Sequence, residues 1–174
     1  MATGYKLFRQ TKDGNLHPLF VNASQTLPIG EWLPAECGER LENGKVKSRL
    51  GGLAFRPGWH LNDKIPYVDH IYTVHEGAKY LKDNCVWAEV EYNEKSYQTE
   101  ANNAGLNKKG VVIPKNAQLD YVPVGGYYKY KTNPTMFDAW IISGEIKILR
   151  IVPDAEVEEI CSKAGLTALK RYHG

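Results

Sequence analysis

The fold is decided by residues 84–92, which read NCVWAEVEY. Side chains of different character alternate along this stretch, and a period of two is typical of a strand with two distinct faces. One face collects Val86, Ala88, Val90 and Tyr92, and the other collects Trp87, Glu89 and Glu91. Because the first face is apolar throughout, we expect this strand to lie centrally in a sheet that covers a hydrophobic core.

The beginning of the chain carries the next β signal. Residues 4–22 contain two apolar runs separated by the turn pair Asp13-Gly14, and this arrangement predicts a hairpin. Pro18 has no backbone N–H to donate, so we expect the second arm to lie at an edge of the sheet. The following segment, up to Leu50, is punctuated by proline and glycine and is predicted to be loop.

A second hairpin is predicted near the end of the chain. Residues 140–142 and 146–152 are both apolar, and Ser143-Gly144 between them has the composition of a turn. The second of these runs is rich in β-branched residues, which strands favour. We therefore expect the two runs to pair with each other.

A helix is predicted directly after this hairpin. Pro153 ends the strand, Asp154 suits the N-cap, and acidic residues in the first turn complement the helix dipole. Val157, Ile160, Cys161 and Ala164 form an apolar stripe along it. Gly165 stands where a C-cap glycine belongs, and we expect residues 166–174 to fray.

Together these elements predict an α+β fold, with a mainly antiparallel sheet, N-terminal and C-terminal hairpins and a C-terminal helix. The 174 residues make a single domain, 1–174, with its core at about 4–165. Apolar residues contribute 43% and charged residues 24%, which excludes a disordered chain. The formal net charge of +2 excludes a strongly basic nucleic-acid coat and leaves room for a local basic site.

Several classes of protein are disfavoured by what the sequence lacks. The three cysteines, Cys37, Cys85 and Cys161, are an odd number without C-x-x-C spacing, which argues against a disulfide framework or a zinc site. No histidine spacing matches a metal motif, so we expect neither a metal nor a cofactor. The first residues lack an apolar leader and no run approaches about 20 apolar residues, so we expect a cytoplasmic protein outside the membrane.

The first candidate site is the segment Arg56-Pro57-Gly58-Trp59-His60. A Pro-Gly turn after a strand projects the following side chains from a fixed base. Guanidinium holds phosphate, an indole can stack on a base, and imidazole transfers protons near neutral pH. His70 lies ten residues further on, and the two histidines can divide the acid and base roles. The competing interpretation is that Trp59 packs in the core and His60 is a loop residue.

The second candidate site is the segment 125–134, GGYYKYKTNP. In a strand, Lys129 and Lys131 share one face, and Tyr128 lies on the other. Alternating aromatic and cationic side chains are typical of single-stranded nucleic-acid platforms, and Thr132 and Asn133 can add hydrogen bonds to phosphate. The competing interpretation is an exposed strand whose lysines deter edge pairing.

Four stretches together resemble a known family. They are residues 5–9 (YKLFR), 52–60 (GLAFRPGWH), 86–91 (VWAEVE) and 125–134. Over roughly residues 5–165 the chain is similar to an uncharacterised domain of large polyvalent proteins from phages and other mobile elements. The resemblance implies a setting in which such domains modify or cleave host and foreign macromolecules, and it makes a host protein a candidate partner. It implies no particular reaction and no site residue.

The residues favour a domain that acts on nucleic acid or a nucleotide, with a metal-independent endoribonuclease as the specific expectation. His60 and His70 would be its acid/base pair. Arg56 and Lys131 would hold phosphate, and Tyr128 would lie near the base or the hydroxyl.

Two alternatives stay open. In a mono-ADP-ribosyltransferase, Arg9 would hold the phosphates of NAD and Glu145 would act near the ribose. In a non-catalytic protein-binding or inhibitor module, tryptophan and tyrosine side chains would form the partner surface, since these residues are the usual interface anchors.

Overall fold

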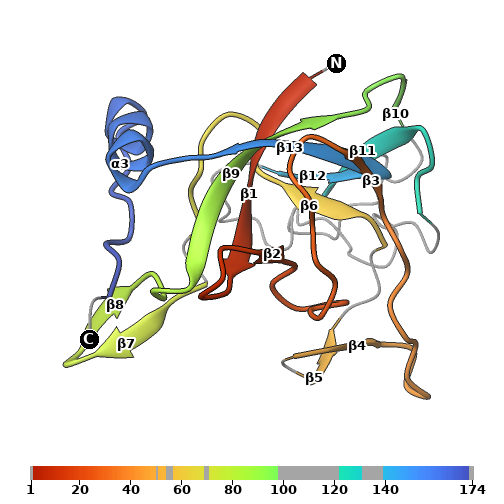
Figure 1. The fold of residues 1–174 in the computed structure, drawn as a ribbon, viewed down its shortest axis with the longest axis horizontal. Coiled ribbons are helices and arrows are strands. Elements are labelled where there is room, and N and C mark those ends of the chain that lie inside the picture. The colour runs from red at the N-terminus through yellow and green to blue at the C-terminus, as the bar shows by residue number, and fades with distance from the viewer. Residues whose placement is uncertain are drawn as a thin grey trace, which may run out of the picture.

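The computed structural model describes residues 2–49, 51–53, 57–68, 71–97, 122–130 and 139–172. Its strands form two main sheets and two short ribbons, with one helix among the described residues (Figure 1). Most strand pairs are antiparallel, as the sequence predicts. The exception in the main sheets is the short parallel pair of β10 (Ser96–Tyr97) and β11 (Gly126–Tyr130).

The larger sheet has five antiparallel strands. In spatial order they are β2 (Leu16–His17), β1 (Ala2–Gln10), β9 (Cys85–Tyr92), β13 (Glu145–Ile151) and β3 (Trp32–Pro34). β9 is the central strand, which confirms the expectation from residues 84–92. β3 falls in the stretch predicted to be loop, where Leu33 is buried opposite Ile146 and pins an edge strand to the core.

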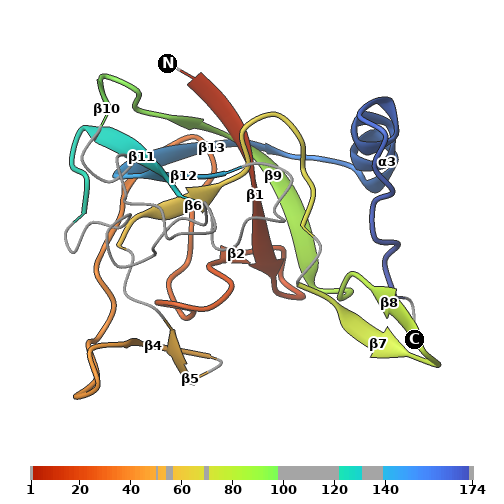
Figure 2. The ribbon, with the colours of Figure 1, turned by 180° about the vertical axis from the view of Figure 1, so that it is seen from behind.

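The smaller sheet has four described strands. In order they are β10 (Ser96–Tyr97), β11 (Gly126–Tyr130), β12 (Trp140–Ser143) and β6 (Trp59–Leu61). Two ribbons stand apart from both sheets: β4 (Val46–Ser48) with β5 (Gly51–Leu53), and β7 (Thr73–His75) with β8 (Ala78–Tyr80). They project from different sides of the molecule, as both views show (Figures 1 and 2).

The predicted C-terminal hairpin is wrong. β12 pairs with β11 and β6, whereas β13 pairs with β9 and β3, so the two runs belong to different sheets. Gly144 between them is the corner where the chain changes sheet, and a Cβ there would clash with the backbone carbonyl of Pro123. Only a glycine allows this close approach, so the Ser-Gly pair makes a bend and not a tight turn.

The two sheets also meet at a second corner. Tyr5 of β1 and Asn62, just after β6, exchange both backbone hydrogen bonds, each 2.7 Å long. With strands joined at both corners, the sheets enclose one apolar cluster to which both contribute. Its fully buried members include Phe8, Leu61, Ala88, Val90, Ile146 and Ile148.

The helix α3 (Asp154–Lys163) follows β13 and packs with Val157 and Cys161 buried. Asp154 is its first helical residue, and Pro153 takes the N-cap position. The helix ends as predicted: Gly165 has a φ of 76°, and the N–H of Leu166 donates to the carbonyl of Cys161. This hydrogen bond and the positive φ of Gly165 are features of a Schellman cap.

The C-terminal tail is held where the sequence predicted fraying. Leu81 exchanges backbone hydrogen bonds with Lys170 and Tyr172. The Arg171 guanidinium donates to the carbonyls of Asp83 and Cys85 and forms an ion pair with Asp154 at 2.9 Å. The tail thus runs from the end of α3 to the β7–β8 ribbon (Figure 2).

The sequence also predicts a short helix over residues 96–105, which Gly105 would end, and a brief strand over residues 111–113. Both lie mostly or wholly outside the described residues. Of the helix expected at 96–105, the structure describes only Ser96 and Tyr97, which form β10. The strand expected at 111–113 is outside altogether. Within the described ranges, no helix is both long and apolar enough to cross a membrane.

Candidate functional site

A cavity of about 410 Å³ opens beside β6, where the two sheets meet. Its walls come from β1, from the segment 18–22 after β2, and from the turn at Pro57-Gly58 that leads into β6. Sites for small molecules in proteins usually enclose about 300–1,000 Å³, so this cavity has the size of a ligand site.

Apolar and aromatic side chains form much of the cavity wall. The segment after β2 supplies Leu19, Phe20 and Val21, and the indoles of Trp59 and Trp140 face the same space. Such walls, with a few polar groups among them, are typical of sites that take a planar or apolar ligand.

Lys6 places an ammonium group in this cavity. It lies on the same face of β1 as the fully buried Phe8, because the two residues are two positions apart. Its Nζ donates to the carbonyl of His60 at 3.0 Å and lies 5.7 Å and 5.8 Å from the ring centroids of Phe8 and Trp59. Among the described residues, no carboxylate forms an ion pair with it.

The surroundings of Lys6 change its acidity. Burial of the ammonium lowers the pKa of Lys6 from 10.5 to about 8. Removal from water disfavours the charged form, and no described carboxylate compensates for the loss. Ionisable groups with perturbed pKa values gather at functional sites, which makes Lys6 the leading candidate residue.

His60 and Trp59 both line the cavity from β6. The Nδ1 of His60 lies 3.2 Å from the carbonyl oxygen of Gly58, and its ring packs edge-on against Trp140 at 5.9 Å. Trp59 is only 8% exposed, and its indole N–H donates to the carbonyl of Leu33 at 2.9 Å. Trp59 therefore packs in the core, as the competing interpretation held, and also lines the cavity.

Further polar groups surround the cavity. The side-chain amide of Asn62 donates to the carbonyl of Tyr67 at 2.8 Å, which fixes its position at the wall. Asn22 and Gln25 line another part, and so does the exposed Glu36. The cavity thus combines the Lys6 ammonium and one exposed carboxylate with neutral hydrogen-bonding groups.

The second candidate segment lies in the same sheet as His60, on the far side of β12. Tyr128 and His60 both pair with Ile142 and therefore face the same side of the sheet. Tyr128 is fully buried, so its ring packs inside the protein and is out of reach of a nucleic acid at the surface. Lys129 is exposed on the opposite face, as the predicted alternation requires.

The other predicted site residues lie outside the described residues. They are Arg56, His70, Lys131, Thr132 and Asn133. Their roles in binding and acid/base catalysis stay predictions, including the pairing of His60 with His70.

The residues expected for NAD binding lie at opposite ends of the larger sheet. Arg9 pairs with Cys85 at one end of β9, and Glu145 adjoins Ile146, which pairs with Tyr92 at the other end. Seven residues of strand separate the two ends, which is about 23 Å at 3.3 Å per residue. The guanidinium of Arg9 donates to the carbonyl of Ala23, and the carboxylate of Glu145 accepts from Asn93.

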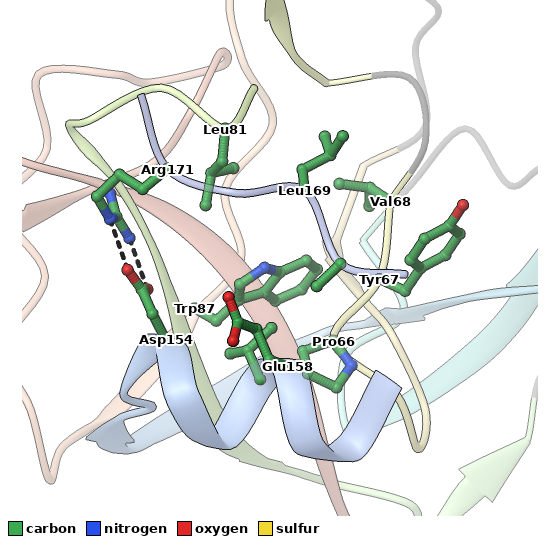
Figure 3. A pocket seen from close by; sticks show the side chains of 11 residues that line it. Pro66, Tyr67, Val68, Leu81, Trp87, Asp154, Glu158, Leu169 and Arg171 are labelled. Carbon is green, nitrogen blue, oxygen red and sulfur yellow. Dashed lines mark hydrogen bonds and ion pairs between the residues drawn. The ribbon is translucent and has the colours of Figure 1, made fainter. Parts of the chain in front are cut away.

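A second cavity lies between α3 and the tail, but it is small. It measures about 40 Å³ and is lined by Trp87, Leu81 and Leu169 among others, with the Arg171–Asp154 ion pair at its side (Figure 3). A cavity of this volume can admit a water molecule but is too small for a metabolite.

Sequence reasoning missed Lys6. The available signal was its position two residues before Phe8, which puts a lysine on the apolar face of a strand. The local pattern could not show the contribution of β6, which lies 53 to 55 residues further along the chain. This strand supplies the carbonyl of His60 and the indole of Trp59 next to the ammonium.

Within the described ranges, no three His, Cys, Asp or Glu side chains gather as metal ligands. Comparisons with models of protein families, with curated proteins and with solved structures gave no match.

Proposed function

We propose that the chain binds a nucleotide, free or exposed in a nucleic acid, in the cavity around Lys6 and His60. The observation that carries the proposal is the Lys6 ammonium inside a cavity of about 410 Å³, without a described carboxylate partner. A phosphate oxygen can accept a hydrogen bond from this ammonium, and its negative charge can compensate the buried positive charge.

The rest of the cavity suits the other parts of a nucleotide. The apolar and indole walls provide a surface on which a base can stack. The neutral amides of Asn22 and Gln25 can hydrogen-bond to a sugar or base edge. Because the pKa of Lys6 is about 8, the affinity for phosphate should fall as pH rises above that value and the ammonium is lost.

The binding test compares adenosine monophosphate, adenosine and inorganic phosphate by calorimetry. We expect the monophosphate to bind best, and Lys6→Met to weaken it about 10- to 100-fold, the cost of one hydrogen bond to a charged group. The matched control is Lys12→Met, because Lys12 is an exposed lysine in the turn after β1 and lies away from the cavity. Equal affinity for adenosine and its monophosphate, or no effect of Lys6→Met, would refute the role of Lys6.

A cleavage reaction would build on this binding. His60 lines the same cavity and is the candidate for acid/base transfer in metal-independent RNA cleavage. In the presence of EDTA, His60→Ala and His70→Ala should each lower the cleavage rate by about 10²- to 10⁴-fold. If the wild-type protein binds nucleotides and leaves RNA intact, the chain is a binding module without this activity.

A further inference from the structure

We propose that Lys6 is also the nucleophilic amine of this cavity and forms a reversible imine with an aldehyde that carries a planar, largely apolar group. This chemistry uses the same cavity as the proposed nucleotide site but does not depend on a phosphate. The two proposals can therefore fail separately.

The placement of Nζ supports this role. Lys6 lines the cavity from β1, and its Nζ donates to one backbone carbonyl and lies near two aromatic rings. Neither kind of partner takes a proton from the amine or blocks it as a carboxylate ion pair would. A ligand that enters the cavity therefore meets the amine beside the Trp59 ring, against which a planar group can lie.

The protonation state of Lys6 allows the reaction near neutral pH. With a pKa of about 8, about 10% of the amine is neutral at pH 7, about 300-fold more than for an unperturbed lysine. Only the neutral amine carries the lone pair that attacks a carbonyl. Lysines desolvated in apolar pockets serve as Schiff-base residues for this reason.

The proposed step balances without an oxidant or a reductant. The nitrogen lone pair forms a bond to the aldehyde carbon, and the carbonyl π electrons move to the oxygen, which takes up a proton. One N–H proton is thereby replaced by the new carbon–nitrogen bond. The resulting carbinolamine then expels its hydroxyl, which takes up the remaining N–H proton and leaves as water, while the nitrogen lone pair forms the carbon–nitrogen double bond. The imidazole of His60, at the wall of the same cavity, is placed to exchange protons with the departing oxygen.

The aldehyde class follows from the cavity wall. Phe20, Val21 and Trp140 offer an apolar surface, and the volume of about 410 Å³ admits a single aromatic ring with substituents. Pyridoxal is a suitable probe because it is a planar aldehyde that carries no phosphate. Pyridoxine has an alcohol in place of the aldehyde and serves as the ligand control.

The experiment treats the full chain with pyridoxal at pH 7, traps any imine with borohydride and maps the adduct by mass spectrometry. We expect Lys6 to be labelled at least tenfold faster than the exposed Lys12, with a rate that levels off above about pH 8 as the amine becomes fully neutral. Pyridoxine should give no adduct. Labelling of Lys6 no faster than of Lys12 would overturn the proposal.

Two variants guard against a folding artefact. Lys6→Arg keeps the charge and cannot form the imine, and Lys6→Met removes the charge and the amine. Both variants should lose the adduct at position 6. A circular dichroism spectrum of each variant checks that it is folded. An adduct at Lys6 in a protein that fails to bind adenosine monophosphate would support the imine and refute the nucleotide proposal. Nucleotide binding without an adduct would do the opposite.

Discussion

Replacement of Lys6 by methionine should change the pH dependence of stability in a defined direction. The folded protein releases the Lys6 proton at about pH 8, whereas an unfolded chain releases it near 10.5. Between these values the unfolded state binds more protons, so the stability of the wild-type protein rises with pH through this window. Below pH 8 both states are protonated, and the cost of burying the charge is fully present.

The magnitude follows from the difference between the two pKa values. The shift from 10.5 to about 8 corresponds to about 3 kcal/mol at pH 7 and to less than about 1 kcal/mol at pH 10. Methionine has a similar length and no charge, so Lys6→Met removes this cost. It also removes the hydrogen bond to the His60 carbonyl, worth about 1 kcal/mol. We expect the variant to be about 2 kcal/mol more stable than wild type at pH 7.

The assay is urea unfolding followed by tryptophan fluorescence at several values between pH 7 and pH 10. Other titrating groups are common to both proteins, so they largely cancel in the difference between wild type and variant. That difference should shrink steadily with rising pH, while Lys12→Met should differ from wild type by a constant amount. A difference between wild type and Lys6→Met that is independent of pH would refute the account of Lys6.

Two further pairs of substitutions test how the fold is held together. Gly144→Ala should destabilise the protein by more than about 2 kcal/mol, because the new Cβ would clash with the backbone of Pro123. At Gly165 a new Cβ meets open space, so Gly165→Ala should cost about 1–2 kcal/mol from its positive φ alone. Urea unfolding measures both changes in stability. Arg171→Ala should cost about 1–3 kcal/mol and expose the tail amides to hydrogen exchange, because the carbonyls of Asp83 and Cys85 lose their donor. Asp154→Ala removes only an exposed partner of the same arginine and should cost less than about 1 kcal/mol, so equal losses would contradict this division.

Local sequence patterns predicted the strands better than they predicted how strands pair. The alternation in residues 84–92 was sufficient to predict β9 as a central strand, because β1 and β13 pair with its two edges and its apolar face is continuous. The same kind of pattern misled at residues 140–152. A bend and a hairpin turn can share the same dipeptide, and the outcome depends on the close approach of Gly144 to Pro123, 21 residues earlier in the chain.

The candidate site shows the same limit. The sequence drew attention to the segment that ends at His60, because a Pro-Gly turn before an aromatic residue fixes side chains at the start of a strand, and Pro57, Gly58, Trp59 and His60 line the cavity. It assigned Tyr128 to the binding surface, whereas both faces of the smaller sheet carry buried residues, with Ile141 on one and Tyr128 on the other. Alternation separates the faces of a strand but does not say how many of them are covered.

The position of Lys6 depends on the same corner that closes the fold. The backbone hydrogen bonds between Tyr5 and Asn62 hold β1 against the end of β6. This contact brings the Lys6 ammonium to the carbonyl of His60, which lies two residues before Asn62. A methionine would fill this position without the cost of burying a charge. The expected cost of burying this charge at neutral pH, beside a cavity of ligand size, supports the roles proposed for the Lys6 amine.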